Sequence, residues 1–383
     1  MRIKELKAIP IHYLLEKVFK AGTYKVTNRD TIVVVARFED GTQAEVYGGD
    51  EDMEQDRVVS LINGEFQPLI VGLDVDSPED IAAAYEKMMN LPIDLGYRAL
   101  VDLDMGRHGI QQQALSLVDM ALWDGLGKLK KQPVHALLGG ARRDWITVIS
   151  IGGYYHDNDP QGTSDEAASL RDYGVAGLKM KVGRATFEQD VARIEAAWNA
   201  AGKDFMLAVD VNQGWTVAQT KKFCKDAGDL GLAWLEEPVR WYDCLSGLAE
   251  VRKESKIPIV SGQGDISEFR SCDLVRYGAV DQLNTDLTLV GGVTGWMRVA
   301  KFAEKHGVAM GHHEEPQGAL TLLSACEKIG PVEIFANEVR DPLWRKIMAS
   351  PPEIKDGKMK VPQGPGLGIP LNWDFINKYK VAG

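Results

Sequence analysis

The stretch GLKMKVG, Gly177 to Gly183, sets two lysines among apolar residues in a segment otherwise typical of a buried β-strand. Because strand side chains alternate between faces, Lys179 and Lys181 are expected to point to the same side. Like-charge repulsion then depresses the pKa of each ammonium group, and partial burial acts in the same direction. A lysine placed in this way can act as a base near neutral pH. Taken alone, the pair would also suit an exposed edge strand.

Polar residues also stand at the ends of the other apolar runs in this part of the chain. They are Asp210 and Asn212, Glu236 and Glu237, Gln263 and Asp265, Asp286, His312 and His313, and Asn337 and Glu338. A packed core does not tolerate such groups without partners. Carboxylates from neighbouring strands, Asp210 and Glu236, would repel each other unless a cation lies between them. A hard divalent ion with oxygen ligands, most simply Mg²⁺, fits that position.

A histidine and a carboxylate from neighbouring runs predict a second base. Asp286 can accept a hydrogen bond from one imidazole nitrogen of His313, which orients the ring and raises its basicity. Alternation alone does not decide whether His312 or His313 faces inward, because neighbours on a strand face opposite ways. One of the two is therefore expected to lie outside the site.

The runs that carry these residues are eight in number and are separated by segments with helical periodicity. They span 146–155, 174–183, 205–212, 232–238, 257–264, 279–286, 307–315 and 332–338. This repetition predicts an α/β fold, a parallel (β/α)8 barrel of the TIM type, although the last unit is short of a full helix. A doubly wound open sheet is the alternative, but the chain has neither GxGxxG after a first strand nor GxxxxGKS/T.

Residues 1–130 have a different pattern and predict an α+β capping domain ahead of the barrel. TIVVVARFEDGTQAEVYGG indicates two antiparallel strands joined at Asp40-Gly41, and helical patterns follow in SPEDIAAAYEKMM and QQQALSLVDMALWDGLGKL. The barrel is expected to occupy residues 131–360. The segment 361–383 begins with many prolines and glycines and is expected to return to the capping domain and complete it.

Composition excludes several classes of partner. The net charge of −11 over 383 residues has the wrong sign for a nucleic-acid backbone. No apolar run approaches the ~20 residues that span a bilayer, and no secretory signal begins the chain. The four cysteines form no CxxC pair, which favours free thiols in a reducing compartment. We therefore expect a cytoplasmic protein with a small anionic substrate and with neither nucleic-acid nor membrane partners.

With these residues the chain resembles the enolase superfamily, and within it the mandelate racemase and muconate-lactonizing branch, over essentially its whole length. The resemblance implies a capping domain over a modified barrel, a KxK base and three strand-end acids that hold Mg²⁺. In this chain Lys179-Met180-Lys181 is similar to the family's KxK motif. The resemblance implies that Lys181 is the base and that Lys179 lowers the pKa of Lys181. Asp210 in DVNQGW and Glu236 in WLEEP are similar to the first two metal ligands of the family.

The resemblance also extends to the last three barrel strands. It implies a dyad of Asp286 and His313, and an acid that stabilises an oxyanion at Glu338 or Glu333, with Glu338 preferred. Barrels of this branch form homo-oligomers, so self-association is expected.

One position departs from the family pattern. Where the family has a glutamate after PxxxG, this chain has Gln263, whose neutral amide oxygen can bind Mg²⁺ but leaves the site one negative charge short. Asp265 could restore that charge, so the third ligand is Gln263 by position or Asp265 by charge. The stretch HHEEP adds Glu314 beside the dyad, where it could serve as a further acid or base.

The reaction that the resemblance implies is removal of the proton α to a carboxylate, with Mg²⁺ stabilising the enediolate. We expect dehydration of a sugar acid to a 2-keto-3-deoxy acid, because AGTYKVTNRD and GGYYHDN offer a polar lining for a polyol chain. The alternatives are a racemase or epimerase and a ligand-binding barrel without catalysis. The expected substrate-binding residues are Tyr24, Lys25, Asn212, Tyr154, His312 and Glu314.

Overall fold

A closed barrel of eight parallel strands, β4 to β11, forms the centre of the computed structural model, which describes residues 1–49, 54–91 and 107–381. Each strand pairs with the next in chain order, and β11 pairs with β4 to close the barrel. The strands are β4 Trp145–Gly152, β5 Gly177–Lys181, β6 Met206–Asp210, β7 Leu235–Glu236, β8 Ile259–Ser261, β9 Gln282–Leu283, β10 Ala309–His312 and β11 Ile329–Ile334. The predicted barrel is confirmed, and the open sheet is wrong.

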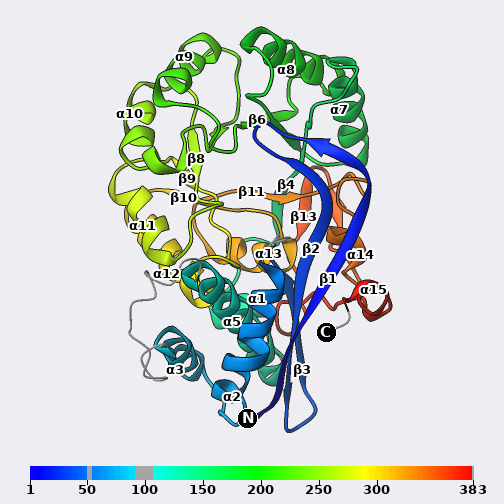
Figure 1. Ribbon diagram of the computed structural model, residues 1–383, viewed down its shortest axis with the longest axis vertical. Coiled ribbons are helices and arrows are strands. Elements are labelled where there is room, and N and C mark those ends of the chain that lie inside the picture. The colour runs from blue at the N-terminus through cyan, green and yellow to red at the C-terminus, as the bar shows by residue number, and fades with distance from the viewer. Residues whose placement is uncertain (50–53, 92–106, 382–383) are drawn as a thin grey trace.

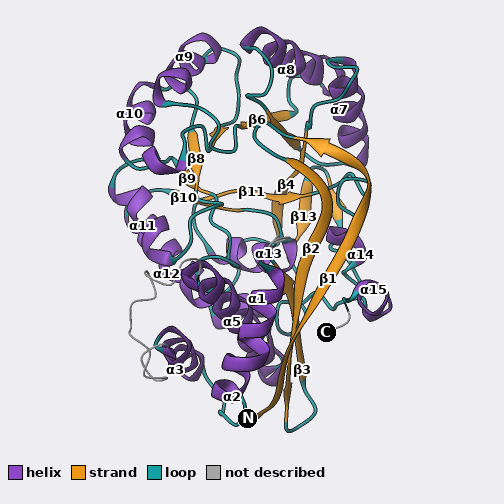
Figure 2. Cartoon of the chain, in the orientation of Figure 1, coloured by secondary structure: helices purple, strands orange, loops and turns teal. Residues whose placement is uncertain are grey.

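Helices surround the barrel on its outside (Figure 1 and Figure 2). They are α7 Gln161–Tyr173, α8 Phe187–Ala201, α9 Val217–Ala227, α10 Ser246–Glu254, α11 Glu268–Arg276, α12 Gly292–Lys305 and α13 Pro316–Ala325, with the 3-10 turn η3 Trp241–Asp243. After β11 only the four-residue helix α14, Leu343–Lys346, follows. The eighth unit is thus short of a full helix, as the sequence predicts.

Alternation along the strands separates an apolar outer face from an inner face that becomes polar at the carboxyl ends. Leu178, Leu207 and Leu235 point outward and join the main core beneath the helices. Ala208 and Trp234 belong to a separate small apolar cluster, with Ile149 and Val260. Two residues further along their strands stand Asp210 and Glu236. The interior of the barrel therefore has an apolar layer with charged groups above it.

A three-stranded antiparallel sheet lies beside the barrel, formed by β1 Ile3–Lys20, β2 Lys25–Phe38 and β3 Gln43–Gly48. The predicted turn at Asp40-Gly41 joins β2 to β3. The long β1–β2 hairpin extends to the barrel near β6 (Figure 1). Gly22 at its tip packs so closely that a Cβ atom would lie 2.6 Å from the Val182 carbonyl oxygen. Thr23 also donates to the Asn212 carbonyl at 3.2 Å, so the tip is fixed to the ends of β5 and β6.

The remaining elements lie at the two ends of the chain. The N-terminal helices are α1 Gln55–Leu61, the π-helix η1 Ile62–Phe66, α2 Gln67–Ile70, α3 Pro78–Met89, α5 Arg107–Lys130 and α6 Val134–Leu137. The C-terminal elements are β12 Ile354–Lys355, β13 Lys358–Lys360 and α15 Trp373–Tyr379. The C-terminal segment contacts the N-terminal sheet. The backbone N–H of Leu371 donates to the Glu45 side chain, and the backbone of Lys380 forms an isolated antiparallel β-bridge with Ile11. No helix in the described ranges is long and apolar enough to cross a membrane.

Helix α5 caps a barrel helix across the two parts of the fold. The first residue before α12 is Gly291, which has no side chain for capping and lies with φ at +98°. Asp119 of α5 accepts hydrogen bonds from Thr294 N at 2.9 Å and Thr294 Oγ1 at 2.6 Å instead. Ser116 Oγ accepts from Gly291 N at 2.9 Å. The buried Asp119 therefore supplies the N-terminal acceptor that α12 lacks.

We expect Asp119→Ala to destabilise the protein by about 2 kcal/mol, because it leaves a partly buried N–H and a hydroxyl group without their acceptor. Urea unfolding monitored by circular dichroism measures the loss. Asp56→Ala, an exposed acid in the first turn of α1, is the matched control and should change the unfolding free energy little. Equal stability of the two variants would contradict the capping role.

Candidate active site

Lys181, Asp210 and Glu236 form a row across three neighbouring strands. The strand register pairs Lys181 with Asp210 and Asp210 with Glu236. Lys181 Nζ lies 2.7 Å from Asp210 Oδ2, and all three side chains are buried. The predicted convergence of Lys181 with the first two strand-end carboxylates is therefore present.

Lys179 is the centre of a second charged cluster on the same face. Its Nζ lies 2.7 Å from Glu236 Oε1 and 2.7 Å from Glu333 Oε1, and its side chain is 0% exposed. Asn284 donates to both glutamates at 3.1 and 3.3 Å, and Trp234 Nε1 donates to the other Glu236 oxygen at 2.8 Å. Glu236 is thus held by three donors, which fixes its orientation.

The prediction that the two lysines have lowered pKa values is wrong for this arrangement, although the charge of Lys181 does act to lower the pKa of Lys179. Burial alone would lower the pKa of Lys181, but the adjacent Asp210 carboxylate outweighs it and holds that pKa well above the ordinary value. Lys179 likewise has a raised pKa, because Glu236 and Glu333 together outweigh its burial and the charge of Lys181. Spacing predicted that the lysines share a face but not that each has its own carboxylate.

Gln263 is oriented by Glu237, which the sequence predicts as a strand-end acid but to which it assigns no role. Gln263 Nε2 donates to Glu237 Oε2 at 3.1 Å, and Gln213 Nε2 donates to the same oxygen at 3.2 Å. Because Nε2 is the amide atom that contacts Glu237, Gln263 Oε1 points away from that side chain. Burial, together with Asp210, Asp265 and Glu236, raises the pKa of Glu237 to about 7. Asp265, by contrast, is engaged by Arg270 Nε at 3.0 Å.

Two amide oxygens in this region have no hydrogen-bond partner among the described residues. They are Gln263 Oε1 and Asn212 Oδ1, both buried. Asn212 adopts a left-handed backbone with φ at 48°, and both its N–H and its Nδ2 donate to Asp210. Within the described ranges, no group of three His, Cys, Asp or Glu side chains is placed so that it could hold a metal ion. The oxygen donors near Asp210 therefore include amides.

His313 and Asp286 form the predicted dyad. His313 Nδ1 lies 3.1 Å from Asp286 Oδ2, and Asp286 also accepts from Thr288 N and Oγ1. Burial alone would lower the pKa of His313, but Glu314 and Asp286 raise it to about 9. At neutral pH the ring is therefore an imidazolium, and it can donate a proton.

His312 is outside the site, which corrects its prediction as a substrate-binding residue. Its Nε2 accepts from Leu287 N at 3.3 Å, and its Nδ1 donates to the Glu314 carbonyl at 3.1 Å. The ring is fully buried and lies 6.2 Å from the Trp296 ring of α12. Both ring nitrogens form hydrogen bonds with backbone atoms, so His312 has no donor or acceptor left for a substrate.

Glu314 and Arg29 connect the dyad to the N-terminal sheet. Glu314 Oε1 lies 3.4 Å from His313 Nε2, and Glu314 Oε2 accepts from Arg29 at 3.1 Å. Arg29 comes from β2 and pairs with Asp341 at 2.6 Å as well. Both Glu314 oxygens therefore have protein partners, which argues against the predicted role of Glu314 in binding the substrate.

Glu338 is not in the site, which corrects the preference for it over Glu333. Its side chain is 45% exposed and lies near Arg345 and Lys346 on the surface. Strand β11 ends at Ile334, so Glu338 belongs to the loop beyond it. Glu333 is the inward residue of β11 and pairs with Lys179. The acid of the eighth strand is therefore Glu333.

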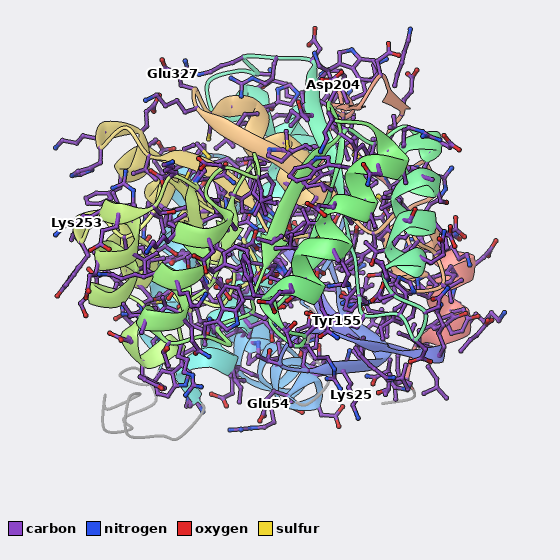
Figure 3. The ribbon with its side chains drawn as sticks, turned by 90° about the horizontal axis from the view of Figure 1, so that it is seen from above. Lys25, Glu54, Tyr155, Asp204, Lys253 and Glu327 are labelled. Atoms are coloured by element: carbon purple, nitrogen blue, oxygen red, sulfur yellow. The ribbon has the colours of Figure 1, made fainter. Side chains whose placement is uncertain are left out.

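Two tyrosines flank Lys181, whereas Lys25 is remote. The rings of Tyr24 and Tyr154 lie 5.8 and 6.0 Å from Lys181 Nζ. Tyr154 OH is buried and meets no partner in the described part of the chain, and Tyr24 is 38% exposed. Lys25, the first residue of β2, is exposed at the periphery of the molecule (Figure 3). Of the predicted lining residues from the hairpin, Tyr24 reaches the site and Lys25 does not.

Some of the site's residues were missed although the sequence carries a signal for them. Asn284 stands two residues before Asp286, and Trp234 two before Glu236, so each shares a face with a predicted site residue. No local signal marks Arg29 as a partner of Glu314, because the two are far apart in the chain. That contact depends on how the sheet docks on the barrel.

Two family models match most of the chain. The model of the mandelate racemase / muconate lactonizing enzyme N-terminal domain matches residues 20–139, and the enolase C-terminal domain-like model matches residues 162–375. D-galactarolactone cycloisomerase of Agrobacterium fabrum is 28% identical over 100% of this chain and 99% of its own length. Arabinonate dehydratase of Saccharolobus solfataricus is 30% identical over 77% of this chain and 79% of its own.

Solved structures and further relatives extend the comparison. A mandelate racemase/muconate lactonizing enzyme from a marine actinobacterium, in complex with magnesium, is 33% identical and has a TM-score of 0.87, covering 100% of this chain and 99% of that one. The relatives include dehydratases, cycloisomerases and a racemase of N-succinyl-L-Arg/Lys. The chain therefore belongs to the enolase superfamily, in its mandelate racemase and muconate-lactonizing branch.

Proposed function

We propose that the protein is a Mg²⁺-dependent dehydratase of a sugar acid, an aldonate or aldarate, that forms a 2-keto-3-deoxy acid. The observation that carries this proposal is the His313 ring, which pairs with Asp286 at 3.1 Å and directly follows β10, a strand separated from that of Lys181 by β4 and β11. Dehydration needs one group that removes the α-proton and another that protonates the departing β-hydroxyl group. The relatives that act on arabinonate and on D-galactarolactone support a substrate of this class.

The residues around Asp210 fit a bound Mg²⁺. Asp210 and Glu236 are adjacent carboxylates, and the Gln263 Oε1 atom is buried and meets no donor among the described residues. Mg²⁺ prefers such oxygen ligands and keeps several waters. We assign Gln263 rather than Asp265 as the third ligand, because the buried Gln263 Oε1 atom lacks any donor among the described residues and would need a cation there. When bound, Mg²⁺ neutralises the substrate carboxylate and stabilises the charge that develops on it.

Lys181 removes the α-proton in the proposed reaction. Its ammonium group is paired with Asp210 at 2.7 Å, and this pairing keeps it protonated. If Asp210 held Mg²⁺, its charge would be shared with the metal and would stabilise the Lys181 ammonium group less. Burial of Lys181 and its repulsion from Lys179 would then favour the neutral amine, which is the form that accepts a proton. Lys179 holds Glu236 and Glu333 in place.

His313 delivers the second proton. The α-carbon loses a proton to Lys181 and becomes part of an enediolate, and the β-carbon then loses its hydroxyl group, which leaves as water after taking the imidazolium proton. The enol that results tautomerises to the 2-keto-3-deoxy acid, so atoms and charge balance. Tyr24 and Tyr154 beside Lys181 offer hydroxyl groups to a polyol chain. The N-terminal part, 1–130 with 361–383, would close the site from the side of the β1–β2 hairpin tip.

The test is a screen of the purified protein with Mg²⁺ against a library of aldonic and aldaric acids, with 2-keto-3-deoxy acid as the readout. A hit identifies both the reaction and the substrate. If no acid in the library gives this product but one of them exchanges its α-proton in deuterated water, the racemase or epimerase would be favoured instead. Silence together with no Mg²⁺ binding would favour a ligand-binding barrel without catalysis.

We expect Gln263→Ala to weaken Mg²⁺ binding by at least about tenfold, because it removes a ligand oxygen. Isothermal titration with MgCl₂ measures the change. Asp265→Asn, in the same loop, is the matched control and should alter the dissociation constant less than about twofold, since Arg270 already holds that carboxylate. The reverse pattern would make Asp265 the ligand.

A further inference from the structure

A continuous chain of charged side chains runs from the barrel dyad to the N-terminal sheet. Asp286 contacts Nδ1 of His313 at 3.1 Å, and Glu314 lies 3.4 Å from Nε2 of the same ring. Arg29 of β2 then pairs with Glu314 at 3.1 Å and with Asp341 at 2.6 Å. None of the five side chains is more than 18% exposed. Contacts of this kind are little screened by solvent.

We propose that Glu314, clamped by Arg29, is a positioning residue that keeps His313 protonated and makes that state depend on docking of the N-terminal sheet. The proposal rests on the proposed function, in which His313 is the proton donor. Glu314 does not touch the reacting atoms in this scheme. It acts through the ring nitrogen that Asp286 leaves unoccupied.

The charges around His313 favour this role for Glu314. The charge of Glu314 is the largest single contribution that raises the pKa of His313; the Asp286 hydrogen bond and the Asp286 charge add to it, whereas burial and Lys179 lower that pKa. The titratable and charged groups that face His313 and its partner carboxylate are Asp286 after β9, Lys179 of β5, Glu333 of β11, His312 and Glu314 at the end of β10, Arg340 after β11, and Arg29 of β2. Removing the Glu314 charge should therefore release the ring proton at lower pH.

Arg29 fixes Glu314 in both charge and place. Although burial would raise the pKa of Glu314, Arg29 and His313 lower it to about 2, so the carboxylate stays ionised. The backbone at Glu314 and Glu315 is left-handed, with φ at 55° and 44°. Non-glycine residues keep such a conformation only where the surrounding structure holds them. The clamp from β2 supplies that restraint, and it exists only while the sheet is docked.

The first test is an NMR titration of the imidazole signals of the full-length protein with Mg²⁺ present, with His313 assigned by comparison with His313→Asn. The wild-type ring should titrate near pH 9. In Glu314→Gln, which keeps the side-chain size and can still accept from Arg29, the His313 pKa should fall by at least about one pH unit, a tenfold change in its protonation equilibrium. An unchanged His313 pKa would overturn the proposal.

The second test addresses the clamp. In Arg29→Met, Glu314 loses the largest of the charges that keep it ionised, so the His313 signal should gain a second inflection above about pH 4, where Glu314 takes up a proton. Arg37→Met, on the same strand with the exposed partner Glu5, is the matched control and should leave the His313 titration unchanged. A wild-type titration curve in a folded Arg29→Met protein would refute the clamp. If that variant fails to fold, Glu314→Gln still decides the role of Glu314.

These titrations need no turnover, so their outcome is independent of the substrate screen. If the His313 pKa falls in Glu314→Gln but no acid in the library gives a 2-keto-3-deoxy product, the positioning role of Glu314 would stand and the dehydratase would be refuted. With a substrate in hand, the alkaline limb of kcat/KM should move to lower pH in Glu314→Gln, because the donor loses its proton earlier. A Glu314 with a purely structural role would lower activity without moving that limb.

Discussion

Replacing Lys181 by alanine is expected to abolish turnover, with kcat lowered by at least about 10³-fold, the scale of a general base. The buried ammonium group beside Asp210 is the proposed acceptor of the α-proton, and alanine offers none. Stopped assays for the 2-keto-3-deoxy product measure the loss.

The fold and the metal site provide the controls for this variant. Lys181→Ala removes the cation that competes for Asp210, so it should bind Mg²⁺ at least as tightly as the wild-type protein. An inactive variant that still binds Mg²⁺ separates loss of the base from loss of the site. Lys253→Ala, an exposed lysine at the periphery (Figure 3), should retain full activity. More than a tenth of wild-type activity in Lys181→Ala would rule out Lys181 as the base.

The barrel and its inward residues could be predicted because strand alternation is a local property. Lys179 and Lys181 share a face whatever the rest of the chain does, and the same period links Asn284 to Asp286. The choice between His312 and His313 could have been made in the same way. Met310 is apolar and buried beneath the outer helices, and His312, two residues on, shares its face. His313 then faces inward.

Strand ends were harder to predict than strand faces. The apolar run of the eighth strand continues to Glu338, but hydrogen bonding stops at Ile334, so Glu338 lies in a loop and the inward acid is Glu333. The lysine pKa values could not be obtained from spacing either. Their direction depends on carboxylates contributed by other strands, at distances that only the closed barrel sets.

Contacts between the N-terminal sheet and the barrel carry no local signal at all. Arg29 stands in a polar stretch that predicts a lining for the site, yet its guanidinium group pairs with Glu314 and Asp341 instead. The same docking brings Asp119 to the start of α12. Both contacts join residues more than a hundred positions apart, so they follow from tertiary packing rather than from periodicity.

His313→Asn is expected to lower product formation by about 10²–10⁴-fold, because it removes the proton donor for the departing hydroxyl group. Exchange of the substrate's α-proton with solvent should persist although product formation is lost. Lys181 is unaltered in this variant, so it should still exchange the substrate's α-proton with deuterium from the solvent, as mass spectrometry of recovered substrate would detect. His306→Asn, an exposed histidine at the end of α12, is the matched control and should turn over normally.

Exchange in the two variants assigns the order of the proton transfers. If His313→Asn exchanges and Lys181→Ala does not, Lys181 reaches the α-proton first and His313 acts on the leaving group, as dehydration requires. If only Lys181→Ala exchanges, His313 is the base, and its imidazolium state in the free protein would have to be reversed before the reaction. Exchange in both variants would mean that both groups reach the α-carbon from their separate strands, which is the arrangement of a racemase and would refute the dehydratase.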